Sequence, residues 1–83
     1  MHYTVYVLYS KSCKRFYTGQ TQDFNNRLNE HNAGETPSIR ACIPLILVWE
    51  KQLESRSEAI ALEKRIKSRG AERFLSDLGI NIK

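Results

Sequence analysis

Three charged or titratable side chains occur where a small protein normally places aliphatic ones. Arg27 and His31 stand one turn apart and border the apolar stripe of a predicted helix, and Glu63 falls within the apolar stripe of another. A guanidinium can bind phosphoryl oxygens with two parallel hydrogen bonds, and a carboxylate can hold a divalent cation. Each residue also has a structural explanation. Arg27 could pack its stem along the helix, and His31 could cap the helix end. Glu63 could reach the surface with its carboxylate or pair with an arginine that borders the core.

A predicted β-hairpin places two tyrosines on one face. Residues 3–9, YTVYVLY, are β-branched and aromatic on both faces, which predicts a strand covered on both sides, and residues 15–19, RFYTG, follow after a turn. With a four-residue loop, Tyr6 pairs with Gly19, and Tyr17 lies on the same face as Tyr6 and diagonal to it. A register slip of one residue would separate the two tyrosines.

The first predicted helix follows this hairpin. It begins near Asp23, a favourable N-cap residue, and ends before Gly34, with Phe24 and Leu28 facing inward. The next stretch, ETPSIRACIP, reads as a loop broken by two prolines. Residues 45–49, LILVW, are expected to form a third strand, whose continuous apolar run favours a central, buried position.

The C-terminal part of the chain predicts two more helices. Ser55 and Glu58 form a capping box that opens a helix running to about Ser68, before Gly70. Its predicted core stripe comprises Ala59, Leu62 and Ile66, with Ile60 at the margin. A short helix over residues 71–78 would bury Phe74, Leu75 and Leu78. We therefore expect one α+β domain over residues 1–83, with a small, mainly antiparallel three-stranded sheet flanked by helices.

Size and composition fit an ordinary globular protein. The chain has 83 residues, of which 41% are hydrophobic and 27% charged. Its longest apolar run, residues 43–49, is far below the roughly 20 residues of a membrane span, and the N-terminus lacks a secretory signal pattern. We therefore expect a cytoplasmic protein, with no membrane partner, in which Cys13 and Cys42 are free thiols.

The charge distribution favours a polyanionic partner. The formal net charge is +4, and five cations crowd one short stretch that contains a single acid, Glu72. They are Lys64, Arg65, Lys67, Arg69 and Arg73. A solvated helix face with cations near its C-terminal end would explain the same pattern.

The order of the polar residues resembles the GIY-YIG endonuclease family, in particular its small stand-alone, single-domain bacterial members. Thr4-Val5-Tyr6 stands where that family has its first signature, and Tyr17-Thr18-Gly19 where it has the second. The helical arginine, the histidine one turn on and the distal glutamate match Arg27, His31 and Glu63. Neither signature is literal, but both tyrosines and the glycine are present. Gln20 stands where some relatives have lysine.

The resemblance implies a divalent-metal-dependent endonuclease that hydrolyses phosphodiester bonds in nucleic acid, with DNA as the expected substrate, in repair or recombination. Glu63 would hold one Mg²⁺ or Mn²⁺ together with solvent and substrate oxygens, and Arg27 would bind the phosphoryl group. Tyr6 would accept the proton of the attacking water, with Tyr17 as its positioning partner and His31 as a further catalytic residue. The implied substrate-binding residues are Gly19, Lys64, Lys67, Arg69 and Arg73.

Two alternatives stay open. The chain could be a catalytically inactive module that keeps the fold and binds nucleic acid or another partner, or a basic protein-interaction domain. A decayed copy should have lost a tyrosine, the arginine or the glutamate, and all of these are present. No separate recognition domain is apparent, so sequence-specific cutting would require a homodimer or a targeting partner.

Overall fold

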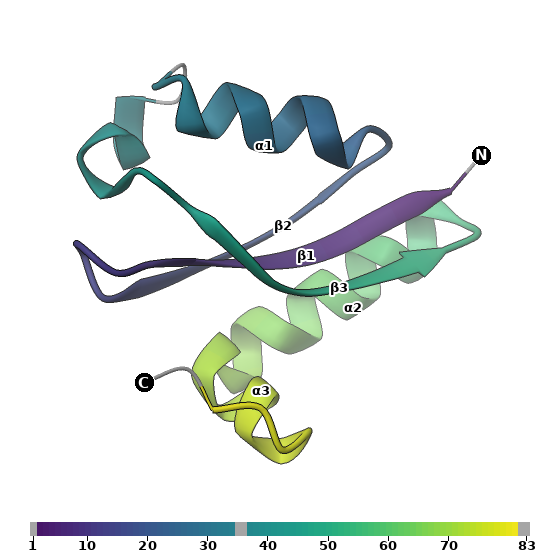
Figure 1. Ribbon diagram of the computed structural model, residues 1–83. Helices are drawn as coiled ribbons and strands as arrows, with labels where there is room; N and C mark the ends of the chain where they lie inside the picture. The colour runs from purple at the N-terminus through teal and green to yellow at the C-terminus, as the bar shows by residue number, and fades with distance from the viewer. Residues whose placement is uncertain (1, 35–36, 82–83) are drawn as a thin grey trace.

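The first two strands form the hairpin around which the molecule is built (Figure 1). The computed structural model describes residues 2–34 and 37–81, apart from the side chains of residues 24, 25, 31 and 37–39. β1 (Tyr3–Ser10) pairs antiparallel with β2 (Arg15–Thr21), with Tyr6 opposite Gly19. This register is the predicted one, because a four-residue loop and the alternation of side chains leave little freedom to slip.

The third strand lies at the edge of the sheet. β3 (Ile46–Leu53) pairs antiparallel with the free side of β1, which gives the order β2-β1-β3. The prediction of a central position for residues 45–49 is therefore wrong. β1 is paired on both sides and is buried along most of its length, whereas β3 continues into the exposed polar residues Glu50 and Lys51.

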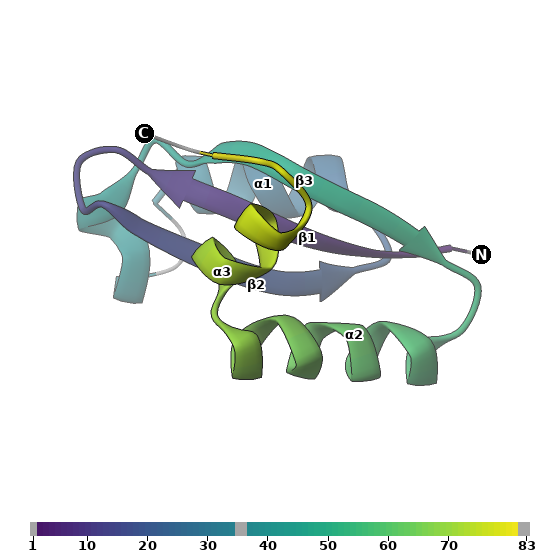
Figure 2. The ribbon, with the colours of Figure 1, turned by 90° about the horizontal axis from the view of Figure 1, so that it is seen from below.

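Helices cover both faces of the sheet (Figure 2). Val5 and Val7 point to one face, which we call the valine face, where α2 (Arg56–Arg69) and α3 (Ala71–Asp77) pack. The buried partners on this face are Ala59, Ile66 and Leu75. Tyr6, Leu8 and Tyr17 lie on the opposite face, which we call the tyrosine face, together with Leu28 of α1 (Phe24–Asn32), Leu45 and Leu47. The predicted α+β class and three-stranded antiparallel sheet are confirmed.

The helix ends follow the predicted capping. Asp23 Oδ1 accepts a hydrogen bond from the Asn26 backbone N–H at 3.2 Å, and Ser55 Oγ accepts one from Glu58 N–H at 3.2 Å. α2 ends at Gly70, whose φ of 91° lies in the region that favours glycine. α3 buries Leu75 as predicted but ends at Asp77, so Leu78 is 53% exposed and that part of the prediction is wrong.

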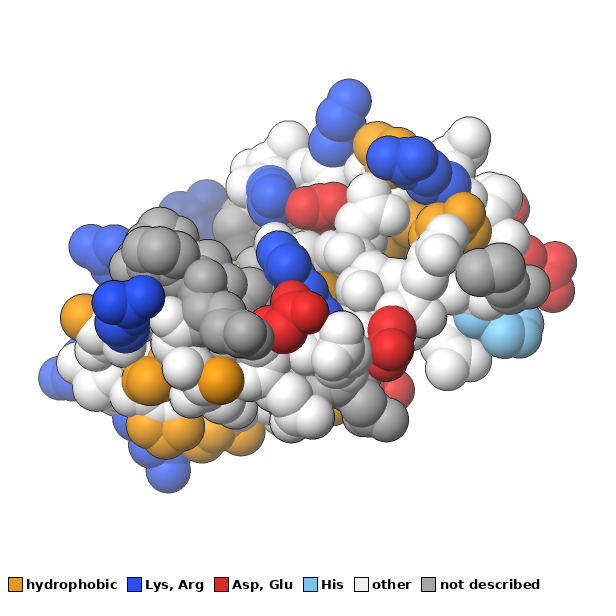
Figure 3. All heavy atoms as spheres, turned by 90° about the horizontal axis from the view of Figure 1, so that it is seen from above, with side chains coloured by type: hydrophobic (Ala, Val, Ile, Leu, Met, Phe, Trp, Pro, Cys, Tyr) orange, Lys and Arg blue, Asp and Glu red, His pale blue; other side chains and the backbone are white. Residues whose placement is uncertain are grey.

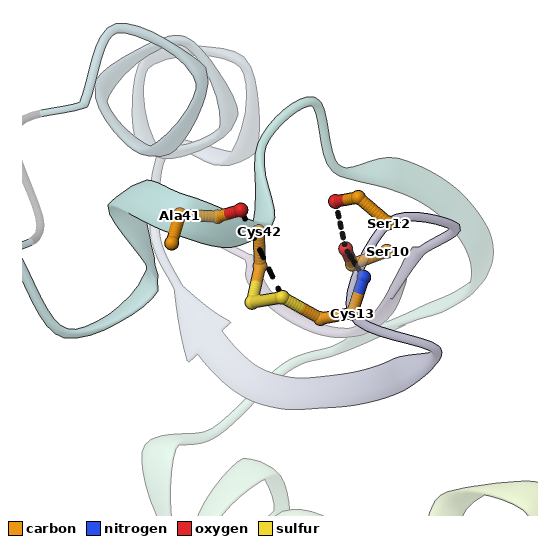
Figure 4. The surroundings of a disulfide bond; sticks show 5 residues. All are labelled: Ser10, Ser12, Cys13, Ala41 and Cys42. Atoms are coloured by element: carbon orange, nitrogen blue, oxygen red, sulfur yellow. Dashed lines mark hydrogen bonds between the residues drawn. A yellow bond between two sulfur atoms is a disulfide. The ribbon is translucent and has the colours of Figure 1, made fainter.

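The segment between α1 and β3 is more ordered than a loop. Within the stretch predicted to be a loop, η1 (Pro37–Cys42) is a 3₁₀ helix. Cys42 at its end forms a disulfide with Cys13 in the β1–β2 turn, with their Cα atoms 5.3 Å apart (Figure 4). The prediction of free thiols is therefore wrong. The fold brings together two cysteines 29 positions apart, and such a cross-link typically stabilises a small domain by about 2–4 kcal/mol.

Candidate active site

The tyrosine face gathers the two predicted catalytic tyrosines. Tyr6 is 4% exposed and packs with Leu8 and Leu45, while Tyr17 is half-buried against the same cluster. Alternation along the hairpin produces this arrangement, because Tyr17 is opposite Leu8, two residues beyond Tyr6. Both phenols are therefore held by packing on one side of the sheet.

Gly19 leaves room for the ring of Tyr6. A Cβ atom at Gly19 would lie 2.7 Å from Tyr6 Cζ and 3.2 Å from Cε1, and would be closer still to the hydroxyl oxygen. Such separations are below van der Waals contact, so only a residue without a side chain lets the ring lie across β2. Gly19 thus permits the observed position of the Tyr6 ring and hydroxyl, which gives the Tyr-x-Gly pattern a physical meaning.

α1, which packs on the tyrosine side of the sheet through Leu28, carries Arg27. Leu28 packs into the tyrosine cluster, while the adjacent Arg27 side chain is 46% exposed. Its guanidinium lies 3.5 Å from the Glu30 carboxylate, one turn further along the helix. An exposed pair of this kind contributes little to stability, so an incoming phosphate could displace Glu30. The side chain of His31, the other predicted residue of α1, lies outside the described residues.

Asn32 joins α1 to β3 and was not singled out from the sequence. Its Oδ1 accepts a hydrogen bond from the Leu45 N–H at 2.7 Å, and its Nδ2 donates one to the Leu45 carbonyl at 3.3 Å. Leu45 is buried beside Tyr6, so this amide pins the end of α1 to the tyrosine face. An asparagine at a helix end is common, and its partner lies 13 residues away, so no sequence signal identifies the contact.

Glu63 occupies a different position from the tyrosines. It lies on α2 between Ala59 and Ile66, whose side chains pack on the valine face. Its side chain is 19% exposed, and its carboxylate pairs with Lys67 Nζ at 2.8 Å. α2 also packs against β2, the edge strand that carries Tyr17 and Gly19, and runs alongside it (Figure 2). The sheet therefore lies between α2, which carries Glu63, and the tyrosine face.

The described residues fit only a metal site that has few protein ligands. Among residues 2–34 and 37–81, no group of three or more His, Cys, Asp and Glu side chains converges. Mg²⁺ keeps several waters and is often held by one or two carboxylates and substrate phosphates. The partly exposed carboxylate of Glu63 suits such a site, with the Lys67 ammonium as its competitor.

The predicted substrate-binding cations are exposed but not equivalent. Lys64, Lys67 and Arg73 lie on the surface of α2 and α3. Arg69 instead forms a two-point pair with Asp77, with Nε at 2.9 Å from Oδ2 and Nη2 at 3.1 Å from Oδ1. The hydrogen bonds from Arg69 hold the pKa of the Asp77 carboxyl below its ordinary value. This pair links α2 to α3.

Charges of both signs meet on the α1 side of the molecule. In the view from above, basic and acidic side chains stand next to one another near the middle of the face (Figure 3). A polyanion that approaches this side must therefore displace acids from their cationic partners, as at Arg27 and Glu30.

No helix that the structure describes is both long enough and apolar enough to cross a membrane.

Comparisons with known proteins agree with this architecture. A UPF0213 protein of Haloquadratum walsbyi is 40% identical to the chain over 98% of this chain and 92% of its own length. Another, of Halobacterium salinarum, is 41% identical over 81% of this chain and 86% of its own. The solution NMR structure of a UPF0213 protein from Bacillus halodurans matches with a TM-score of 0.58 and 31% identity, covering 92% of this chain and 84% of that one.

The family comparison covers most of the chain. Residues 2–73 match the model of the GIY-YIG catalytic domain, a span that contains both tyrosines, Gly19, Arg27 and Glu63. The chain therefore belongs to the GIY-YIG family of nuclease domains.

Proposed function

We propose that this chain is a divalent-metal-dependent endonuclease that hydrolyses phosphodiester bonds in DNA, in repair or recombination. The observation that carries the proposal is the packing of the Tyr6 ring across Gly19, on the face of the sheet that is covered by α1, the helix that carries Arg27. A buried phenol in a defined position, on the side of the sheet where α1 carries an exposed guanidinium, suits proton transfer coupled to phosphate binding. Family membership supports the same reaction class.

Arg27 and the two tyrosines would have separate roles in the proposed reaction. Arg27 would exchange Glu30 for the scissile phosphate and neutralise charge that develops on its oxygens. Tyr6 would accept the proton of the attacking water, and Tyr17 would position Tyr6 or that water. Burial on the tyrosine face keeps both rings in place, which lowers the cost of orienting them during reaction.

Glu63 would hold the metal ion once Lys67 is displaced. A bound Mg²⁺ or Mn²⁺ would stabilise negative charge on the leaving oxygen. Since the sheet lies between α2 and the tyrosine face, we infer that substrate is bound around the β2 edge of the sheet, with Gly19 at the crossing point. The small glycine would let the phosphate backbone approach that edge closely.

The test is a cleavage panel with matched variants. End-labelled duplex, nicked, branched and single-stranded DNA, with an RNA of the same sequence, are incubated with and without Mg²⁺ or Mn²⁺. Wild type should cut at least one DNA only with metal, and Glu63→Gln should not cut at any metal concentration tested. Glu54→Gln is the control, because Glu54 is an exposed carboxylate just before α2. Metal-independent cutting, or a folded Glu63→Gln protein that cuts normally, would refute the proposal.

The metal assignment has a readout that does not depend on activity. Mn²⁺ titrated calorimetrically into protein bound to a cleavage-resistant DNA duplex, with the duplex alone as the blank, should bind wild type and Glu54→Gln, and should bind Glu63→Gln much more weakly. Equal binding by all three proteins would remove Glu63 from the metal site.

One observation favours an inactive nucleic-acid-binding module instead. Glu63 is already paired with Lys67 and lies on a helix whose buried side chains pack on the opposite face of the sheet from the tyrosines. A protein that binds every member of the panel and cuts none, with either metal, would establish this second function.

A further inference from the structure

The β1–β2 turn and the first residue of β2 carry a group of cations that the assigned site does not use. Lys11, Lys14 and Arg15 lie within five consecutive positions, and all three side chains are exposed. None of them forms an ion pair with any acid that the structure describes. We call these three residues the basic turn. Three exposed cations this close in sequence concentrate positive charge at this end of the sheet.

The basic turn is unusually well fixed (Figure 4). Ser10 Oγ accepts a hydrogen bond from the Cys13 N–H at 3.1 Å and lies 3.2 Å from Ser12 Oγ. The disulfide to Cys42 ties the turn to η1, where the Ala41 carbonyl oxygen lies 3.8 Å from Cys13 Sγ. A disulfide sulfur carries no hydrogen, so this last approach is a van der Waals contact.

The backbone of the turn also carries strain. Lys14 has a φ of 55°, in the left-handed region that a lysine seldom adopts. A turn selected for stability alone would place glycine or asparagine there. A lysine at this position adds a positive charge to the basic turn despite the strain.

We propose that the basic turn is a phosphate-contacting element for a nucleic-acid backbone, held ready by the Cys13–Cys42 disulfide. The inference rests on the proposed function, because it names a surface for the same substrate. Cations on a fixed turn lose little conformational freedom when they bind, so the cross-link should improve affinity without adding a contact.

The first experiment measures the salt dependence of binding. A fluorescent 30-base-pair DNA duplex is titrated without metal at several NaCl concentrations. A plot of the logarithm of the association constant against the logarithm of the salt concentration has a negative slope. For the variant Lys11→Gln/Lys14→Asn/Arg15→Gln, this slope should be shallower by about 2 to 3, since each lost phosphate contact removes about 0.9. Asn is used at position 14 because it tolerates a positive φ.

The control removes charge at the far end of the sheet. Lys51→Gln/Arg56→Gln neutralises two exposed cations near the point where β3 leads into α2. Lys51 is opposite Val5, near the start of β1, whereas the basic turn follows the end of β1. Its slope should match wild type. Equal slopes for wild type and the basic-turn variant, or no DNA binding by wild type, would overturn this proposal. A wild type that binds through the basic turn but never cuts would refute only the nuclease.

The second experiment tests the role of the disulfide. Cys13→Ser/Cys42→Ser should bind the duplex about three- to tenfold more weakly than wild type at one salt concentration, with an unchanged slope. Circular dichroism confirms that the variant is folded at the assay temperature, and wild type in a phosphine reductant should behave like the variant. Unchanged affinity in a folded variant would show that the disulfide does not prepare the turn.

Discussion

Gly19→Ala tests whether the position of the Tyr6 ring underlies the site. The added Cβ would lie 2.7 Å from Tyr6 Cζ, so ring and strand must move apart by several tenths of an ångström or more. Forcing one methyl group into a packed contact costs about 1–3 kcal/mol. For a domain of this size, we therefore expect a melting temperature roughly 4–24 °C lower, measured by circular dichroism. Cleavage should fall further than stability explains, because the hydroxyl is displaced.

A double-mutant cycle separates the ring contact from other effects of the new methyl group. Tyr6→Leu removes the outer ring atoms, so in that background Gly19→Ala should lower the free energy of unfolding much less than in wild type. The coupling energy between the two positions should be about 1–3 kcal/mol. Tyr6→Phe keeps Cζ, so in that background the penalty should persist. If Gly19→Ala costs the same in the Leu background as in wild type, the contact is not the cause.

Gly70→Ala is the matched control for the same chemical change. Nothing lies within 4 Å of a Cβ built at Gly70, but its φ of +91° strains any other residue. The variant should therefore lose stability through its backbone and still cleave at the wild-type rate while it is folded. If Gly19→Ala melts and cleaves like wild type, the reasoning about Tyr6 is refuted.

Three further predictions concern the tyrosines, the α1 anchor and pH. Tyr6→Phe and Tyr17→Phe should both fold, and at least one should lose about 10²–10⁴-fold in cleavage rate; two normal rates would remove the phenols from the mechanism. Asn32→Ala should lower the free energy of unfolding, measured in urea, by about 1–3 kcal/mol, because both backbone groups of Leu45 lose their partner. Asn32→Asp should have an intermediate effect, and no change in Asn32→Ala would mean that water replaces the two hydrogen bonds. The lowered pKa of Asp77 means that its contribution is present above its ordinary pKa of about 3.9 and is lost as pH falls through the lowered value. Asp77→Asn should therefore flatten the acid side of the melting profile between pH 5 and 2, and an unchanged profile would show that the pair adds nothing.

Local patterns in the sequence determined the hairpin, the helices and the tyrosine pair. Alternation and a short loop set which residues share a face, so Tyr6 meets Gly19 and shares its face with Tyr17. Capping side chains act within three residues, which is why Asp23 and Ser55 mark the helix starts correctly. Such features depend on neighbours along the chain and need no knowledge of the fold.

The tertiary structure alone decided which of two apolar strands is central and where distant side chains meet. Both β1 and residues 45–49 are rich in apolar side chains, and only the pairing of β1 on two sides makes it the buried strand. Two long-range contacts form because η1 and the start of β3 fold back onto the hairpin and α1. They are the Cys13–Cys42 disulfide and the hydrogen bonds between Asn32 and Leu45. Contacts between segments that only the packed sheet brings together leave no periodic trace in the sequence, because each partner is compatible with many others until the layers assemble.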